Sequence, residues 1–148
     1  MGRKTWDSIP PKFRPLKDRL NIVITRNVEE FGKSIERKSE VEGPIVASGI
    51  VDALSQLEKK QEVERVYVIG GASIYQTVLE LPQTKRVLLT KIHEEYECDT
   101  FFPVNLEESA VWRKAGREEL EEFTGEKVDE GGVEEKGVKF EFCLFERE

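Results

Sequence analysis

Short apolar runs bounded by charged residues recur along the chain and predict strands. They lie at residues 21–25, 44–48, 65–69 and 86–92. Their length and their β-branched side chains are typical of buried strands. Apolar residues also recur at helical spacing over residues 50–61 and 72–79, and Pro82 ends the second helix. Strands that alternate with helices in this way predict an α/β fold with a mainly parallel sheet.

The last third of the chain has a different pattern, in which apolar and more polar residues alternate. The apolar positions of this run are Val138, Phe140, Phe142 and Leu144. Such alternation predicts a half-buried antiparallel strand. Residues 112–120 are expected to form an edge strand, and residues 124–137 a mobile loop. We therefore predict a single domain over residues 1–148, in which a mixed, mainly parallel sheet is flanked by helices and ends in an antiparallel strand pair.

Length and composition narrow the class of protein. A chain of 148 residues suits one compact domain. No apolar stretch approaches the roughly 18 residues that a membrane-spanning helix needs, and the first residues lack the apolar core of a signal peptide. Cys98 and Cys143 are too few for a disulfide scaffold and are expected to be buried or half-buried thiols. We expect a cytoplasmic protein with no membrane partner.

Charge is unevenly spread along the chain. The net charge of −7 argues against nucleic acid as a partner. Residues 1–26, however, hold seven basic side chains and two acidic ones. A compact basic segment can hold a small anion, such as a phosphorylated cofactor or a carboxylate. On charge alone, a solvated basic surface is the more common explanation.

Two short segments could bind phosphate. Residues 69–73 end a predicted strand with Gly70-Gly71 and open a helix, where backbone N–H groups are unpaired. Phosphate binding and simple turn geometry explain this pair of glycines equally well. Residues 2–5 and 25–26 offer cations and hydroxyls near strand ends. Helix capping and surface charge are the commoner explanation for either segment alone.

Other catalytic constellations are not found in the sequence. His93 is the one histidine, with no serine or cysteine arrangement to join and no metal-ligand spacing to either cysteine. It is expected to be an exposed residue at a strand end. Trp6 and Trp112 are expected to pack in the core or at its rim. The sequence thus predicts neither a metal site nor a nucleophilic triad.

Read in order, several segments closely resemble dihydrofolate reductase, over essentially the whole chain. The segments are Met1-Gly2-Arg3-Lys4-Thr5-Trp6-Asp7-Ser8-Ile9-Pro10, Arg14-Pro15-Leu16, Arg19, Asn21, Val68-Ile69-Gly70-Gly71-Ala72-Ser73-Ile74-Tyr75, Leu89-Thr90-Lys91-Ile92 and Asp99-Thr100-Phe101-Phe102-Pro103. The stretch Pro10-Pro11-Lys12-Phe13 is similar to the eukaryotic branch. The family motif that begins with Met1 is internal in that family, so the first strand, the loop over the nicotinamide and the helix with the active-site carboxylate have no counterpart here.

The resemblance implies NADPH as the cofactor. Its expected contacts are Gly2, Arg3, Lys4, Thr5, Thr25, Arg26, Gly70, Gly71, Ala72, Ser73 and Ile74. Residues 3–5 would contact the phosphates, and Thr25 with Arg26 the adenosine 2′-phosphate. Gly70 and Gly71, joined in the family by a cis peptide, would approach the cofactor with residues 72–74.

The resemblance also implies dihydrofolate as the substrate. Its expected contacts are Ile9, Leu16, Arg19, Ile69, Tyr75 and Thr90. Ile9 and Leu16 would line the p-aminobenzoyl channel, and Arg19 would clamp the α-carboxylate through a bidentate pair. The Ile69 carbonyl, Tyr75 and Thr90 would lie near the pterin, with Tyr75 and Thr90 in supporting roles. No Asp or Glu inherits the catalytic acid.

The implied reaction is hydride transfer from NADPH to C6 of dihydrofolate with protonation at N5, which gives tetrahydrofolate. Antifolate-type inhibitors are further expected ligands, and the intact protein is expected to be a monomer. Without the acid, we expect the 148 residues alone to show little turnover and, without the first strand, to be aggregation-prone. The alternatives are a non-catalytic fragment that binds NADPH or folate, and a related NADPH-dependent pterin or pyrimidine reductase.

Overall fold

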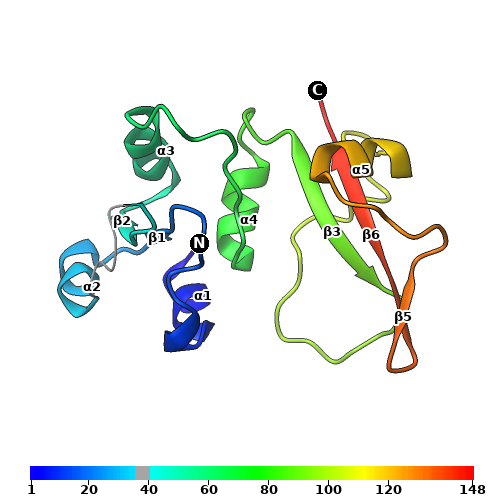
Figure 1. The fold of residues 1–148 in the computed structure, drawn as a ribbon, viewed down its shortest axis with the longest axis horizontal. Coiled ribbons are helices and arrows are strands. Elements are labelled where there is room, and N and C mark those ends of the chain that lie inside the picture. Colours follow the sequence, from blue (N-terminus) through cyan, green and yellow to red (C-terminus); the bar gives the residue numbers. More distant parts are fainter. Residues whose placement is uncertain (36–40) are drawn as a thin grey trace. The chain divides into compact units, whose positions relative to one another are not determined.

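The computed structural model describes residues 1–35 and 41–148, and the chain divides into two compact units, residues 1–79 and 80–148. Each unit has its own sheet (Figure 1). The first unit contains a parallel strand pair, and the second contains four strands joined by antiparallel pairing.

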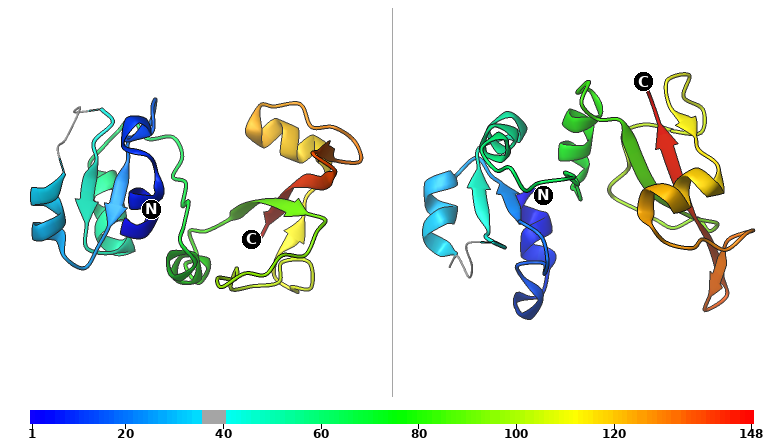
Figure 2. Two further views of the ribbon diagram at one scale, coloured as in Figure 1. Left: turned by 90° about the horizontal axis from the view of Figure 1, so that it is seen from below. Right: turned by 45° about the horizontal axis from the view of Figure 1, so that its top comes forward.

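The sheet of the first unit is formed by β1 (Ile22–Ile24) and β2 (Ile45–Ala47), as the first two apolar runs predict. Val23 lies opposite Val46 in parallel register, and the two strands run side by side (Figure 2). The first two residues extend this arrangement, since Gly2 forms a parallel bridge with Ile24. Three chain segments therefore point the same way and bring their carboxyl ends to one edge.

Helices complete the first unit. They are α1 (Arg3–Ser8), a short 3-10 helix (Pro11–Phe13), α2 (Val28–Ser34), α3 (Ile50–Glu58) and α4 (Ala72–Leu79). The two helices predicted from apolar spacing are confirmed as α3 and α4. Trp6 of α1, Val23 of β1 and Phe31 of α2 form the core, with Trp6 buried as expected. Burial of these large side chains is the main stabilising term for so small a unit.

The strand predicted at residues 65–69 is not formed. Val66, Tyr67 and Ile69 are 54%, 57% and 41% exposed, and no strand pairing involves this run in the described chain. A β-branched run adopts a strand only where a neighbouring strand completes its hydrogen bonds and covers one face. The expectation of a mainly parallel sheet is therefore not met within these two sheets, where parallel pairing is confined to β1, β2 and the bridge at Gly2.

The sheet of the second unit is centred on β6 (Val138–Glu146). β3 (Arg86–Ile92), predicted with these bounds, pairs with it in antiparallel register from Arg86–Glu146 to Ile92–Phe140. β4 (Arg113–Lys114) and β5 (Val133–Glu135) also pair with β6. The predicted antiparallel pairing at the carboxyl end is thus confirmed.

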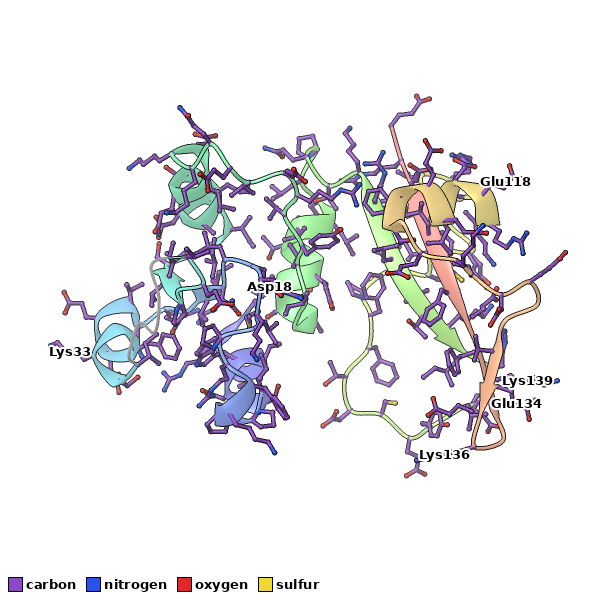
Figure 3. All side chains as sticks on the ribbon, viewed as in Figure 1. Asp18, Lys33, Glu118, Glu134, Lys136 and Lys139 are labelled. Carbon is purple, nitrogen blue, oxygen red and sulfur yellow. The ribbon has the colours of Figure 1, made fainter. Side chains whose placement is uncertain are left out.

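Two predictions for this unit are wrong in detail. Residues 112–120 give a strand of only two residues before α5 (Arg117–Thr124), because Gly116 caps a helix whose first turn is acidic and whose Leu120 is buried. Residues 124–137 do not form a simple loop but include β5, which returns through Lys136 and Gly137. Both turn residues have positive φ, as a two-residue hairpin requires. Figure 3 shows Lys136 at this turn, with Glu134 and Lys139, which pair across the strands, beside it.

The core of the second unit lies on both faces of β6. Leu144 packs with Ala115 and Leu120, and Phe145 is 1% exposed. The predicted alternation holds only in part, because Phe142 is 48% exposed whereas Cys143 is buried. Cys98 is exposed, contrary to expectation, and Trp112 is buried as expected.

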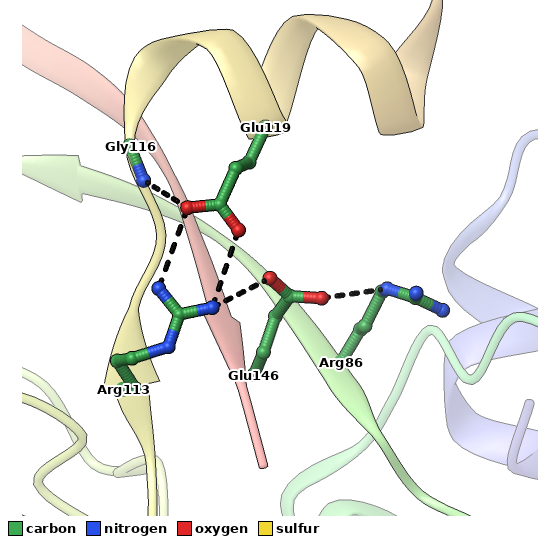
Figure 4. A network of polar contacts seen from close by, with 5 residues as sticks. All are labelled: Arg86, Arg113, Gly116, Glu119 and Glu146. Carbon is green, nitrogen blue, oxygen red and sulfur yellow. Dashed lines mark hydrogen bonds and ion pairs between the residues drawn. The ribbon is translucent and has the colours of Figure 1, made fainter. Parts of the chain in front are cut away.

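A network of charged side chains joins β3, β4, α5 and β6 of the second unit (Figure 4). The Arg113 guanidinium donates to Glu119 of α5 and to Glu146 of β6, both at 3.2 Å, and Arg86 of β3 donates to Glu146 at 3.1 Å. The hydrogen bond from Arg113, together with the one from the Gly116 N–H, lowers the pKa of Glu119 from its usual value of 4.5. The carboxylate therefore stays ionised below the pH at which an ordinary glutamate is protonated, and the network persists there.

Candidate functional site

The carboxyl edge of the parallel pair gathers several of the predicted site residues. Because the bridge at Gly2 and the pairing of β1 with β2 are parallel, α1 begins at the same edge of the sheet at which Thr25 and Arg26 follow β1. The Thr25 N–H donates to the Ala47 carbonyl at 3.0 Å, which fixes the end of β1 against β2. Ligands of open α/β sheets bind at this edge.

The Gly70-Gly71 segment lies against the same place. The Gly2 N–H donates to the Gly70 carbonyl at 2.9 Å, and the Tyr75 N–H donates to the Gly71 carbonyl at 3.0 Å in the first turn of α4. The expected cis peptide joins Gly70 to Gly71. The starts of α1 and α4, far apart in the sequence, are therefore side by side.

At this junction two glycines leave the backbone without a Cβ. A Cβ at Gly70 would lie 3.5 Å from Thr5 Oγ1 and 3.7 Å from the Tyr75 hydroxyl, and a Cβ at Gly2 would lie 3.5 Å from Ile74 Cγ1. Gly70 has φ +119°, a conformation that residues with a Cβ rarely adopt. Burial raises the pKa of the Tyr75 hydroxyl, which therefore stays protonated and can donate a hydrogen bond.

Substituting Gly70 tests this geometry directly. Gly70→Ala is expected to lower the free energy of unfolding by about 1–3 kcal/mol, because alanine is strained at this φ. Gly32→Ala is the matched control, since it lies in α2 with nothing within 4 Å of its added Cβ and is expected to raise the stability by about 0.5–1 kcal/mol. Urea denaturation of both variants measures the two effects, and equal effects of the two substitutions would contradict the prediction.

Cations and hydroxyls surround the junction. Arg3 and Lys4 are exposed on α1, and the Arg3 guanidinium lies 5.4 Å from the centre of the Phe31 ring and 3.8 Å from Asp7. Thr25 is buried, with its Oγ1 accepting the Asn27 N–H at 3.2 Å, and Arg26 next to it is exposed. Arg3, Lys4 and Arg26 are thus accessible to an anionic ligand at this edge of the sheet.

Apart from Tyr75 in α4, the predicted substrate residues of the first unit come from three segments. Ile9 follows α1, Leu16 and Arg19 lie in the loop before β1, and Ile69 precedes the two glycines. Arg19 is exposed, and its Nε donates to the Lys17 carbonyl at 2.8 Å. This hydrogen bond orients the guanidinium fork, whose terminal nitrogens suit a carboxylate.

Thr90, the remaining predicted site residue, belongs to the second unit. It lies at the middle of β3, opposite Phe142 of β6, and is exposed together with Leu88 and Ile92. The structure thus brings the predicted cofactor residues to one edge of the first unit and describes Thr90 within its own sheet.

Asn21 is a buried polar residue for which the sequence predicted no role in the site. Its side chain is 2% exposed and forms four hydrogen bonds to the backbone. One feature of the sequence could have indicated this role: an asparagine stands directly before a strand of β-branched residues, where a buried polar side chain needs hydrogen-bond partners.

Within residues 1–35 and 41–148, no three His, Cys, Asp or Glu side chains are grouped so that they could hold a metal ion. No helix in the same ranges combines the length and apolar character needed to cross a membrane.

Comparison with known proteins identifies the family. A family model described as dihydrofolate reductase matches residues 1–132. The chain is 37% identical to the dihydrofolate reductase of Pneumocystis carinii over 152 residues, covering 100% of this chain and 72% of that protein. It is 39% identical to the dihydrofolate reductase of Candida albicans, and the match covers 99% of this chain and 72% of that protein. The solved structure of Schistosoma mansoni dihydrofolate reductase matches with a TM-score of 0.72 at 28% identity, over 100% of this chain and 73% of that one.

These matches define an oxidoreductase with the α/β fold that the resemblance predicts. The chain belongs to the dihydrofolate reductase family.

Proposed function

We propose that this chain carries the NADPH site and most of the folate site of a dihydrofolate reductase. The observation that carries the proposal is the junction at which the Gly2 N–H donates a hydrogen bond to the Gly70 carbonyl and at which Thr5 and Tyr75 flank bare glycine backbone. A dinucleotide needs such an approach, because its phosphates and rings contact backbone that no Cβ covers. Family membership supports assigning this junction to the cofactor.

The residues present fit NADPH. Arg3 and Lys4 supply positive charge for the pyrophosphate, and Thr25 with Arg26 supplies a hydroxyl and a guanidinium for the 2′-phosphate. Residues 70–73, which are two glycines, an alanine and a serine, offer backbone without bulky side chains. When bound, the nicotinamide supplies the hydride for C6 of dihydrofolate. The protein binds both ligands, orients their rings and excludes water.

Within the first unit, the folate site is assigned to Ile9, Leu16, Arg19, Ile69 and Tyr75. Arg19 binds the α-carboxylate of the glutamate tail, and Ile9 with Leu16 packs against the p-aminobenzoyl ring. The Ile69 carbonyl accepts a hydrogen bond from the exocyclic amine of the pterin. Arg19 favours folate over the untailed substrate of a pterin or pyrimidine reductase, because such a substrate has no glutamate to bind.

The activity of these 148 residues by themselves is a separate matter. The chain covers 72% of the length of the Pneumocystis carinii relative, and the resemblance places the acid that serves N5 in a segment outside these 148 residues. We expect the 148-residue chain to bind NADPH and folate while its turnover is at least about a hundredfold below that of the same chain joined to such a segment. In isolation, the 148 residues would then behave as the non-catalytic fragment that binds NADPH or folate.

Steady-state oxidation of NADPH with dihydrofolate, together with equilibrium binding of each ligand, tests the proposal. Binding of both ligands with weak turnover supports it. Failure to bind either ligand in a folded sample contradicts the proposed function, whereas full turnover contradicts only the placement of the acid.

The preference between NADPH and NADH should depend on Arg26. Arg26→Gln is expected to weaken NADPH binding about tenfold, since a charge-assisted hydrogen bond contributes about 1.5–3 kcal/mol. NADH binding should be unchanged, because NADH has no 2′-phosphate. Lys33→Gln in α2 is the matched control for lost charge. Fluorescence titration with both nucleotides measures the effect, and an equal loss for NADH, or an equal effect of Lys33→Gln, would contradict it.

A further inference from the structure

One buried amide holds the loop that carries Leu16 and Arg19. Asn21, 2% exposed at the start of β1, accepts the Leu16 N–H on Oδ1 at 2.9 Å. Its Nδ2 donates to the Leu16 carbonyl at 2.9 Å and to the Arg19 carbonyl at 3.1 Å. A single side chain therefore binds both ends of the segment 16–19.

The same residue fixes this loop to a second one. The Asn21 Nδ2 also faces the Glu42 carbonyl at 3.2 Å, and the Asn21 N–H donates to that carbonyl at 2.9 Å. The Asp18 N–H donates to Glu42 Oε2 at 2.8 Å. Gly43, with φ +82°, lies so close that an added Cβ would be 3.0 Å from the Asn21 carbonyl. The loop before β1 is thus anchored to the turn before β2 by contacts centred on Asn21.

Anchoring of this kind affects how Arg19 binds a ligand. Arg19 is an exposed side chain on a loop, and ordering both the loop and the side chain on binding costs free energy. With Leu16 and Arg19 already held at the backbone, and the Arg19 Nε on the Lys17 carbonyl, much of that ordering precedes binding. The gain falls chiefly on a ligand carboxylate that Arg19 clamps, because a bidentate ion pair depends more on exact position than the apolar contact of Leu16 does.

We propose that Asn21 is a positioning residue for the folate tail: it presets the segment 16–19 so that Arg19 meets the glutamate carboxylate. The proposal rests on the proposed function, in which Arg19 binds that carboxylate. Asn21 does not itself touch the ligand, but through Arg19 it helps the site distinguish folates that have a glutamate tail from those that lack one.

The test compares the dissociation constants of folate and pteroic acid, which is folate without its glutamate. Asn21→Asp keeps the shape and the acceptor for Leu16 but replaces the donor with a carboxylate oxygen that faces carbonyls. It is expected to reduce the preference for folate about tenfold, with pteroic acid affinity changed by less than about threefold. Arg19→Leu, which removes the clamp, should abolish the preference. Ala53→Gly, in α3 and away from the loop, should leave it unchanged although it destabilises the unit.

A second variant and a measurement on the unaltered chain guard against misfolding. Asn21→Ser, which removes most of the bonds without adding charge, should give the same loss of preference. In the unaltered chain, hydrogen exchange at the Leu16 and Asp18 amides should be slow, and folate should slow it further than pteroic acid does. Rapid exchange of the Leu16 amide in the folded, unaltered chain would overturn the proposal.

The outcomes separate the two proposals. If the unaltered chain binds folate and pteroic acid equally, the assigned role of Arg19 fails and the inference fails with it. If Arg19→Leu abolishes the preference while Asn21→Asp and Asn21→Ser retain it, the proposed function stands and the positioning role of Asn21 is overturned.

Discussion

Phe145→Ala is expected to lower the free energy of unfolding by about 3–5 kcal/mol, the largest effect of any single substitution considered for this chain. Phe145 is 1% exposed on β6, so its removal loses the transfer free energy of the ring and leaves a cavity in the close-packed core of the second unit. Urea denaturation followed by circular dichroism measures the loss.

The matched control lies on the same strand. Phe142 is 48% exposed, and Phe142→Ala removes an identical ring from a position that water already reaches. It is expected to change the stability by less than about 1 kcal/mol. Comparable losses for both variants would mean that the ring of Phe142 is also buried in solution.

Arg19→Leu is expected to weaken dihydrofolate binding about a hundredfold, because a bidentate pair to a carboxylate contributes two charge-assisted hydrogen bonds. Leucine retains much of the aliphatic stem, so the change isolates the guanidinium. Fluorescence titration with dihydrofolate measures the loss, and NADPH binding should be unaffected.

Lys17→Leu controls for the electrostatic field around the loop. Lys17 is exposed two residues before Arg19, and its removal changes the net charge by the same amount. It is expected to weaken dihydrofolate binding less than about threefold, because an exposed charge without a direct contact is screened. A similar hundredfold loss would show that charge alone, and not the geometry of Arg19, attracts the substrate.

Local patterns predicted the elements whose structure depends on their own residues. The bounds of β3 and α4 follow from apolar spacing, and Pro82 ends α4 as expected. The run at residues 65–69 has equally strong β-branched character but forms no strand, since a strand also needs a partner that its own residues cannot supply. Pattern alone could not detect that difference.

The hairpin of β5 and β6 was not predicted, because β5 has the composition of a loop although it has a partner strand. Val133–Glu135 is short and acidic, so its composition resembles a loop, and it forms a strand because the turn at Lys136 and Gly137 returns the chain beside β6. Here turn geometry outweighs composition.

The residues of the site could be predicted only when they were considered together. Gly70, Gly71 and Thr5 each had an ordinary explanation, and the motif order indicated a common role before their contact could be known. The structure adds the contact itself, through the bond from Gly2 to Gly70 and the bare glycine backbone beside Thr5. Asn21 could not be found from spacing, because its partners are backbone atoms of two loops and backbone atoms leave no signature in the residue types.

The two thiols of the second unit differ in accessibility, since Cys98 is exposed and Cys143 is buried. Burial also raises the pKa of Cys143, so a thiol reagent should modify Cys98 at once and reach Cys143 only when β6 detaches from its neighbours. The two cysteines can therefore report local unfolding. The slow modification of Cys143 has a rate set by how often the second unit opens, and measuring that rate across urea concentrations would give the local stability of the unit without any added label.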